Sequence, residues 1–169
     1  MKKIAIFAGL ATTLGALPAA HAQSSLDLYG LMDAGLVQEG GVSKLTSGIS
    51  AGSRLGFRGT EALGNGLQAV FTLEAGVQGD TGRSDQGGQL FGRQAFVGLN
   101  SPLGMLTMGR QYNLQSQALT DVADPFEGGL AGAATNLAGY SATRIDNTVR
   151  YTSPELRGVT ATVMYGFGE

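Results

Sequence analysis

Apolar and polar side chains alternate strictly in the segment SRLGFRGTEALGNGLQAVFTLE. Because side chains on a β-strand point to opposite faces in turn, Arg54 and Arg58 share one face, and Leu55 and Phe57 share the other. A helix is disfavoured because each of the two glycines in GFRG costs about 1 kcal/mol relative to alanine in a helix interior. The glycines on either side of Asn65 supply the positive φ angles of a tight turn, so we predict a β-hairpin here.

Seven alternating segments of this kind follow one another after residue 22: SLDLYGLMDAGLVQE, GISAGSRLGFRGTEAL, LQAVFTLEAGVQG, LFGRQAFVGLNS, MLTMGRQY, RIDNTVRYTS and GVTATVMYGFG. Several have 10 to 15 residues, more than the ~5–6 of a common globular strand and enough for the ~9–11 of a tilted membrane-spanning strand. Alternation by itself also fits a soluble β-sandwich.

The connections between these segments differ in length in a regular way. Loops of about ten residues join the first segment to the second and the third to the fourth, and about thirty residues join the fifth to the sixth. The other connections are tight turns. Outer-membrane barrels have short turns at one end and long loops at the other, so we predict an all-β fold, an antiparallel transmembrane β-barrel.

Two arginines do not fit the alternation. Arg93 is in step with the apolar Val97 and Leu99, and Arg110 is in step with Met108. Either a bulge shifts the faces by one residue, or the polar side of these strands carries aliphatic side chains packed beneath a loop. We favour the second explanation, because the thirty-residue connection begins directly after the fifth segment and needs a surface on which to rest.

The first 22 residues have the pattern of a secretory signal peptide. Lys2 and Lys3 precede an apolar run, and Ala20-His21-Ala22 is a small-x-small cleavage site. We therefore expect residues 1–22 to be removed. A transmembrane anchor is the alternative, but the run is shorter than the ~20 residues that span a bilayer.

Composition excludes many kinds of chemistry. His21 is the only histidine, and the chain has no cysteine. Without either residue in the mature chain there is no catalytic triad, no thiol nucleophile and no histidine-based zinc site. We expect no enzyme, no cofactor and no metal. Nine cationic and thirteen acidic side chains remain after residue 22, a net charge of −4, which argues against a nucleic-acid partner.

Glycine is unusually common, at 28 of 169 residues, more than twice the usual share of about 7%. The glycines lie inside the alternating segments, which argues against low-complexity disorder. No segment after residue 22 reaches the ~18 consecutive apolar residues of a membrane helix. A membrane location would therefore require strands.

The segments LDLYGLMDAGL, SRLGFRGTEALGNGLQAVFTLE, GRQAFVGL, GRQY and NTVRYTSP resemble the opening half of a general diffusion porin of the Gram-negative outer membrane, most closely its β-proteobacterial branch. The resemblance implies a sixteen-stranded barrel that forms trimers and whose third loop folds into the lumen. We expect residues 23–169 to be the N-terminal part of such a barrel, since seven strands is an odd number and single-chain bacterial barrels have even numbers.

The resemblance also implies a constriction between a basic wall and an acidic loop. The loop corresponds to about residues 113–143, and its order PFEGG departs from the family's usual Pro-Glu-Phe-Gly-Gly, which displaces Glu127 by a residue. The implied residues are Arg54, Arg93 and Arg144 on the wall, and Asp121, Glu127 and the extra candidate Asp124 on the loop. Alternation supports Arg54 and Arg144, which lie on polar faces, but not Arg93.

Other charged residues on the polar faces are weaker candidates for the lumen. Arg58 is expected to pair with Glu61 or with a neighbouring strand, and Arg110 and Arg150 are secondary candidates. Ordinary surface or loop positions are the alternative for Arg54 and the loop acids. The remaining polar-face acids are expected to be partners in networks on the wall; they are Asp27, Asp33 and Glu74.

The function implied by the resemblance is a water-filled channel for passive diffusion of small hydrophilic solutes and ions. The expected partners are outer-membrane lipid and two further copies of the chain in a homotrimer. A small exported barrel or sandwich that acts as an adhesin, and an outer-membrane hydrolase, are the alternatives; the absence of mature histidine argues against the hydrolase. The sequence leaves ion selectivity and the preferred solute open.

Overall fold

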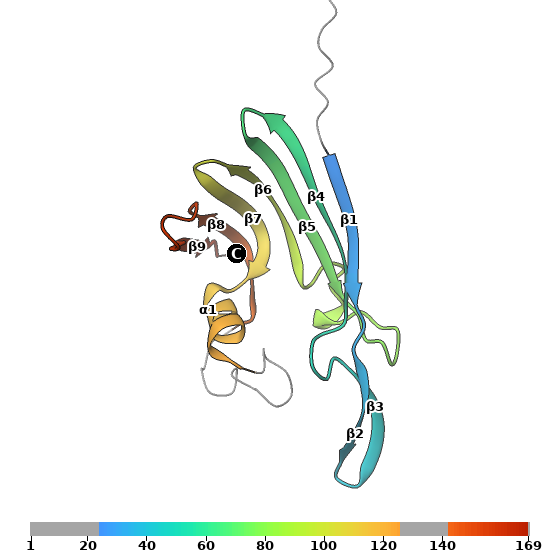
Figure 1. Cartoon of the computed structure of the whole chain (residues 1–169). Helices are drawn as coiled ribbons and strands as arrows, with labels where there is room; N and C mark the ends of the chain where they lie inside the picture. The colour runs from blue at the N-terminus through green and yellow to red at the C-terminus, as the bar shows by residue number, and fades with distance from the viewer. Residues whose placement is uncertain (1–23, 126–141, 169) are drawn as a thin grey trace, which may run out of the picture.

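The computed structural model describes residues 24–125 and 142–168, and its main feature is one curved antiparallel sheet (Figure 1). The sheet has seven strands in the order β1-β4-β5-β6-β7-β8-β9, so each strand pairs with the next along the sheet and the seven predicted strands are confirmed. Their bounds are β1 (Ser24–Leu31), β4 (Arg54–Gly64), β5 (Leu67–Gly76), β6 (Gln94–Ser101), β7 (Gly104–Tyr112), β8 (Arg144–Thr152) and β9 (Thr162–Gly166).

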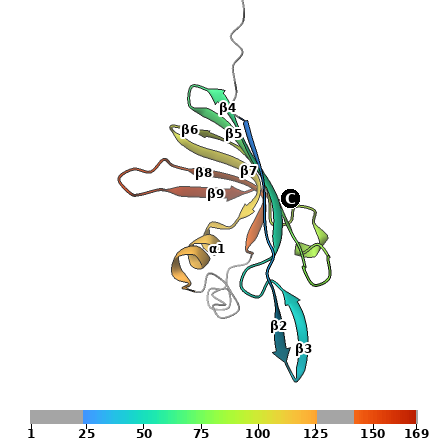
Figure 2. The ribbon, with the colours of Figure 1, turned by 45° about the vertical axis from the view of Figure 1, so that its right-hand side comes forward.

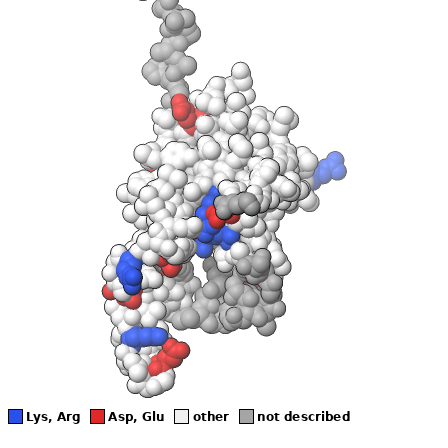
Figure 3. Space-filling view, turned by 180° about the vertical axis from the view of Figure 1, so that it is seen from behind, with Lys and Arg blue, Asp and Glu red and all other residues white. Residues whose placement is uncertain are grey.

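The first strand is shorter than the alternation predicted, and a separate hairpin follows it. The hairpin consists of β2 (Ala34–Glu39) and β3 (Val42–Ser47), which pair only with each other and project beyond the sheet (Figures 1 and 2). Gly40 and Gly41 have φ angles of 58° and 82°, which suits a two-residue hairpin turn. The expectation of a plain loop here is therefore wrong. Figure 3 shows charged side chains of both signs at the end of this hairpin.

Asp33 organises the chain where it leaves the sheet for this hairpin. Its carboxylate accepts hydrogen bonds from the backbone N–H groups of Ser50 (2.5 Å) and Ala51 (2.7 Å). The backbone N–H groups of Ala51 and Ser50 lower the pKa of the Asp33 carboxyl below its ordinary value of 3.8, because they stabilise the charged form. This half-buried carboxylate thus fixes the return of the chain toward β4.

The turns and loops lie at opposite ends of the sheet, as predicted. Asn65, between β4 and β5, has a φ of 52° and lies between two glycines that also have positive φ. At the other end are the β2–β3 hairpin, a loop that contains η1 (Gln86–Gly88), and the chain that follows β7. That chain forms α1 (Leu114–Ala118) and the single π-helical turn η2 (Leu119–Ala123).

In this sheet polar side chains are buried and apolar side chains are exposed, the reverse of the arrangement in a soluble protein. Among the described residues no apolar side chain is buried, whereas eight polar or charged residues are. Those eight are Ser53, Glu74, Arg93, Thr107, Gln111, Ser116, Asp124 and Thr148. Large apolar side chains are exposed instead; they include Leu26, Leu28, Leu55, Phe57, Val97, Leu99, Met108 and Val163. This polarity is typical of a membrane barrel with an apolar outer band and a polar interior.

No helix in the described ranges is both long enough and apolar enough to cross a membrane.

The structure contradicts the proposed packing of aliphatic side chains beneath a loop. Val97 and Met108 are 55% and 50% exposed, on the apolar outer side. Arg93 lies in a bend before β6 begins, so the alternation of that strand does not determine its direction. Near Arg110, the pairing of β7 with β8 shifts register between Gly109 and Gln111. An irregular backbone at the strand ends therefore accounts for both exceptions.

Candidate functional site

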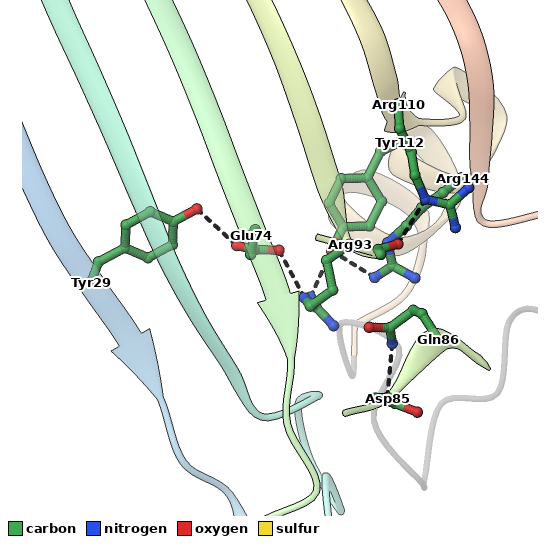
Figure 4. Close-up of polar contacts among 9 residues, drawn as sticks. Tyr29, Glu74, Asp85, Gln86, Arg93, Arg110, Tyr112 and Arg144 are labelled. Atoms are coloured by element: carbon green, nitrogen blue, oxygen red, sulfur yellow. Dashed lines mark hydrogen bonds and ion pairs between the residues drawn. The ribbon is translucent and has the colours of Figure 1, made fainter. Parts of the chain in front are cut away.

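Polar side chains from four strands of the sheet and from the bend before β6 form one continuous network (Figure 4). The Tyr29 hydroxyl on β1 donates to Oε2 of Glu74 on β5 at 3.0 Å. Arg93 donates from Nε to Oε1 of the same carboxylate at 2.7 Å and from Nη2 to the Tyr112 hydroxyl at 2.6 Å. Arg144 on β8 donates to that hydroxyl at 2.9 Å. The network thus runs across the wall from β1 to β8.

The ion pair between Arg93 and Glu74 is the most deeply buried part of this network. Their side chains are only 7% and 5% exposed. The backbone reinforces the pair, because the N–H of Arg93 donates to the carbonyl of Glu74 at 3.1 Å. Removal of one partner from a buried pair costs about 3–5 kcal/mol, because the other charge stays desolvated. The pair therefore fixes the chain at the start of β6.

Tyr112 holds two arginines of like charge close together. Its hydroxyl accepts from both Arg93 and Arg144, and its ring lies under the Arg144 guanidinium with 4.5 Å between Cζ and the ring centroid. A guanidinium over an aromatic ring contributes about 0.5–2 kcal/mol. Tyr112 therefore orients Arg144 without neutralising its charge.

A hollow of about 520 Å³ lies beside this network. It brings together Arg54, Arg93 and Arg144, the three predicted wall residues, with the loop residue Asp121. The rest of its lining comes from the segment before β4, from Tyr112 and from the start of the long loop; these residues are Gly48, Ser50, Ala51, Gly52, Tyr112, Ser116, Gln117, Thr120 and Thr143. The hollow therefore places three arginines beside the start of the long loop.

The family model described as "Gram-negative porin" matches residues 8–169. The chain belongs to this porin family. Its predicted family, its fold class and its outer-membrane location are thereby confirmed.

Named porins are similar to the chain over nearly all of its length. It is 37% identical to an outer membrane porin protein of Bordetella pertussis, over 99% of this chain and 48% of that protein. It is also 37% identical to outer membrane porin protein 32 of Delftia acidovorans, over 92% and 48% respectively. The anion-selective porin from Comamonas acidovorans has a similar structure, with a TM-score of 0.72, 33% identity and coverage of 86% and 47%. The chain thus spans about half the length of the relatives it matches.

The secondary arginines make contacts that give each a separate structural role in this porin chain. Arg58 pairs with Asp27 on β1 at 3.2 Å, so the predicted pairing with a neighbouring strand is confirmed. Arg110 donates to Asp146 at 2.7 Å and to the Gly92 carbonyl at 2.8 Å. Among the described residues, neither arginine lines the hollow.

Arg150 connects the wall to the helix that follows β7. It is half-buried, and its Nη1 donates to Oε1 of Gln117 on α1 at 2.8 Å. Asn113 caps the same helix by accepting from the N–H of Gln115 at 3.0 Å, and its own N–H donates to the Thr143 carbonyl at 3.0 Å. Both ends of the long loop are thus attached near the hollow.

The predicted acidic loop is described only in part. Asp121, in η2, is exposed and lines the hollow, whereas Asp124 is buried at the end of η2. Glu127 lies outside the described residues, as does most of the predicted loop at 113–143. The structure therefore brings one of the three acidic candidates to the arginines in the described part of the loop.

Sequence reasoning missed Tyr112, although it connects Arg93 to Arg144. The available signal was its position as the last residue of the segment MLTMGRQY, directly before the long loop. A polar aromatic residue at this point can reach two neighbouring strands. Glu74 was expected to join a network on the wall, and it does.

Proposed function

We propose that the chain forms part of the wall of a water-filled channel in the outer membrane, through which small hydrophilic solutes and ions diffuse without catalysis or energy input. The observation that carries this proposal is the polarity of the sheet. Charged residues such as Arg93 and Glu74 are buried on the inside, and residues such as Leu28 and Val97 are exposed on the outside. This arrangement separates lipid from a wet interior, since a charge on the lipid face costs about 2–4 kcal/mol at mid-membrane.

The hollow is the proposed constriction of this channel. Arg54, Arg93 and Arg144 form its basic side, and the start of the long loop, with Gln117, Thr120 and Asp121, lines it as well. Charged rings and clusters of this kind set the selectivity of pores. The excess of arginine, together with 33% identity to a porin described as anion-selective, supports a preference for anions.

Three further features belong to the same proposal. Residues 1–22 act as a signal peptide that directs export. Lipid covers the apolar outer face, and the protein assembles as a trimer; a solved neighbour with the same fold, OmpT of Vibrio cholerae, is described as a trimer. No observation favours the adhesin alternative.

The test is ion conductance in planar lipid bilayers, with the protein purified from the outer membrane. We expect stepwise conductance increases that scale with the bulk conductivity of the electrolyte, as in a wide water-filled pore. In a salt gradient, the sign of the zero-current potential should show a preference for chloride over potassium. Heat-denatured protein is the control. Absence of conductance from correctly folded protein would refute the channel proposal.

A further inference from the structure

The three arginines of the hollow differ in how their charges are compensated. Arg93 forms an ion pair with Glu74 at 2.7 Å. Arg54 and Arg144 form no ion pair with any residue in the ranges 24–125 and 142–168. The electrostatic attraction that an anion in the hollow feels therefore differs from one arginine to the next.

The surroundings of Glu74 keep its carboxylate paired with Arg93. Its two carboxylate oxygens are each occupied, Oε1 by Arg93 and Oε2 by the Tyr29 hydroxyl. With both side chains of the pair almost fully buried, neither water nor a passing ion can readily replace the partner. At a distance, a close pair of opposite charges acts as a dipole, whose field falls off faster than that of a single charge.

We propose that Glu74 is a specificity-determining residue of the pore: it cancels the charge of Arg93, so that the field on a passing ion comes from Arg54 and Arg144. This inference deepens the proposed channel function and rests on it. Arg93 then acts as a positioning residue, which holds Tyr112 and through it Arg144 at the hollow.

The first test compares two substitutions that each remove one negative charge. Glu74→Gln keeps the shape of the side chain and leaves Arg93 uncompensated. Glu61→Gln, on the same wall, is the matched control; it is exposed on β4, seven residues from Arg54 and so about 23 Å away along the strand. We expect Glu74→Gln to raise the chloride-to-potassium permeability ratio about threefold, the effect of one charge about 7 Å away in water, and Glu61→Gln to leave it unchanged. An equal response to both substitutions would overturn the proposal.

The second test removes the pair as a whole. If Glu74 cancels Arg93, then Glu74→Gln combined with Arg93→Gln should lose the rise in permeability ratio seen in Glu74→Gln alone. Its ratio should fall below that of the unmodified protein by no more than the ratio of Tyr112→Phe does, because that substitution removes the same hydroxyl contact between Arg93 and Arg144. Arg54→Gln or Arg144→Gln alone should lower the permeability ratio about threefold. The double variant also avoids an unpaired buried charge, so it keeps the test open if Glu74→Gln does not fold. A drop in the double variant that exceeds that of Tyr112→Phe and equals that of Arg54→Gln would show that Arg93 acts on ions directly and would overturn the proposal.

A third measurement separates this inference from the channel proposal. The line width of chloride-35 in nuclear magnetic resonance reports chloride association with folded protein in detergent, whether or not the protein conducts. We expect broadening to increase in Glu74→Gln, to lose that increase in the double variant, to stay unchanged in Glu61→Gln, and to decrease in Arg144→Gln. This order in a protein that does not conduct would support the role of Glu74 while the channel proposal fails. Equal broadening in all variants would overturn the role of Glu74.

Discussion

Thr148 offers a sharp test of the polar interior, because it is among the most buried residues described, at 1% exposure. Its Oγ1 donates to the Gly109 carbonyl at 2.6 Å and accepts from Nε2 of Gln111 at 3.0 Å. Gln111 in turn accepts from the Thr107 hydroxyl at 2.6 Å. One hydroxyl therefore joins β8 to β7 beside the register shift.

Thr148→Val replaces this hydroxyl by a methyl group of nearly the same size. Two hydrogen bonds are lost, at about 1 kcal/mol each, and the Gly109 carbonyl and the Gln111 side-chain N–H both lose this buried partner, which costs up to about 2 kcal/mol more. We expect the free energy of unfolding to fall by about 2–4 kcal/mol. Thr162→Val is the control, since the Thr162 hydroxyl makes only a long contact, 3.4 Å, with Thr152.

Urea titration of the protein folded into lipid vesicles measures this difference. Tyrosine fluorescence is the natural signal, since the chain has five tyrosines and no tryptophan. The urea midpoint should fall clearly in Thr148→Val. In Thr162→Val the free energy of unfolding should fall by less than about 0.5 kcal/mol. Equal midpoints in the two variants would mean that water satisfies the freed groups, and the reasoning from burial would be wrong.

Three further predictions concern the loop end and a turn. Gln117→Ala should release α1 from Arg150, and limited proteolysis should then cut the segment after β7 faster, whereas unchanged cleavage would show that the contact does not hold the helix. Because the pKa of Asp33 is lowered below 3.8, its contribution to stability is present above that pH and is lost as the pH falls through the lower folded value. Hydrogen exchange of the Ala51 amide, after correction for the intrinsic effect of pH, should rise in that window in the natural protein and be fast at every pH in Asp33→Ala; a flat profile would contradict the assignment. Asn65→Val should lower stability by about 1–2 kcal/mol because a β-branched residue resists the φ of 52°, whereas Asn65→Gly should not; equal urea midpoints for the two would refute this.

Local patterning was enough to predict the strands and the tight turns. Side chains on a strand alternate by geometry, so the opposite placement of Arg54 and Leu55 follows from the sequence alone. Glycine on each side of Asn65 likewise determines a turn without any tertiary contact. The seven strands of the main sheet follow from these local signals, whereas the separate β2–β3 hairpin does not.

Prediction was wrong where a strand ends or bends. The alternation runs without a break from Leu31 through Ala34, yet the structure ends β1 there, because Asp33 binds the backbone of residues 50–51 and redirects the chain. The direction of the Arg93 side chain could not be predicted either. Arg93 lies in a bend before β6, and its side chain is held by Glu74, nineteen positions away. The alternation of side chains along a single strand carries no information about either contact.

The sequence by itself determined which residues are on the same face of each strand, where the chain turns, and that residues 23–169 contain neither histidine nor cysteine. It could not determine which charges meet, because Tyr29, Glu74, Arg93, Tyr112 and Arg144 become neighbours only when five parts of the chain are paired in register. Alternation is a property of one strand, whereas an ion pair depends on the register between strands and on backbone irregularities at their ends. Only the tertiary structure decided that Arg93 is paired with Glu74 and that Arg54 and Arg144 have no ion-pair partner among the described residues.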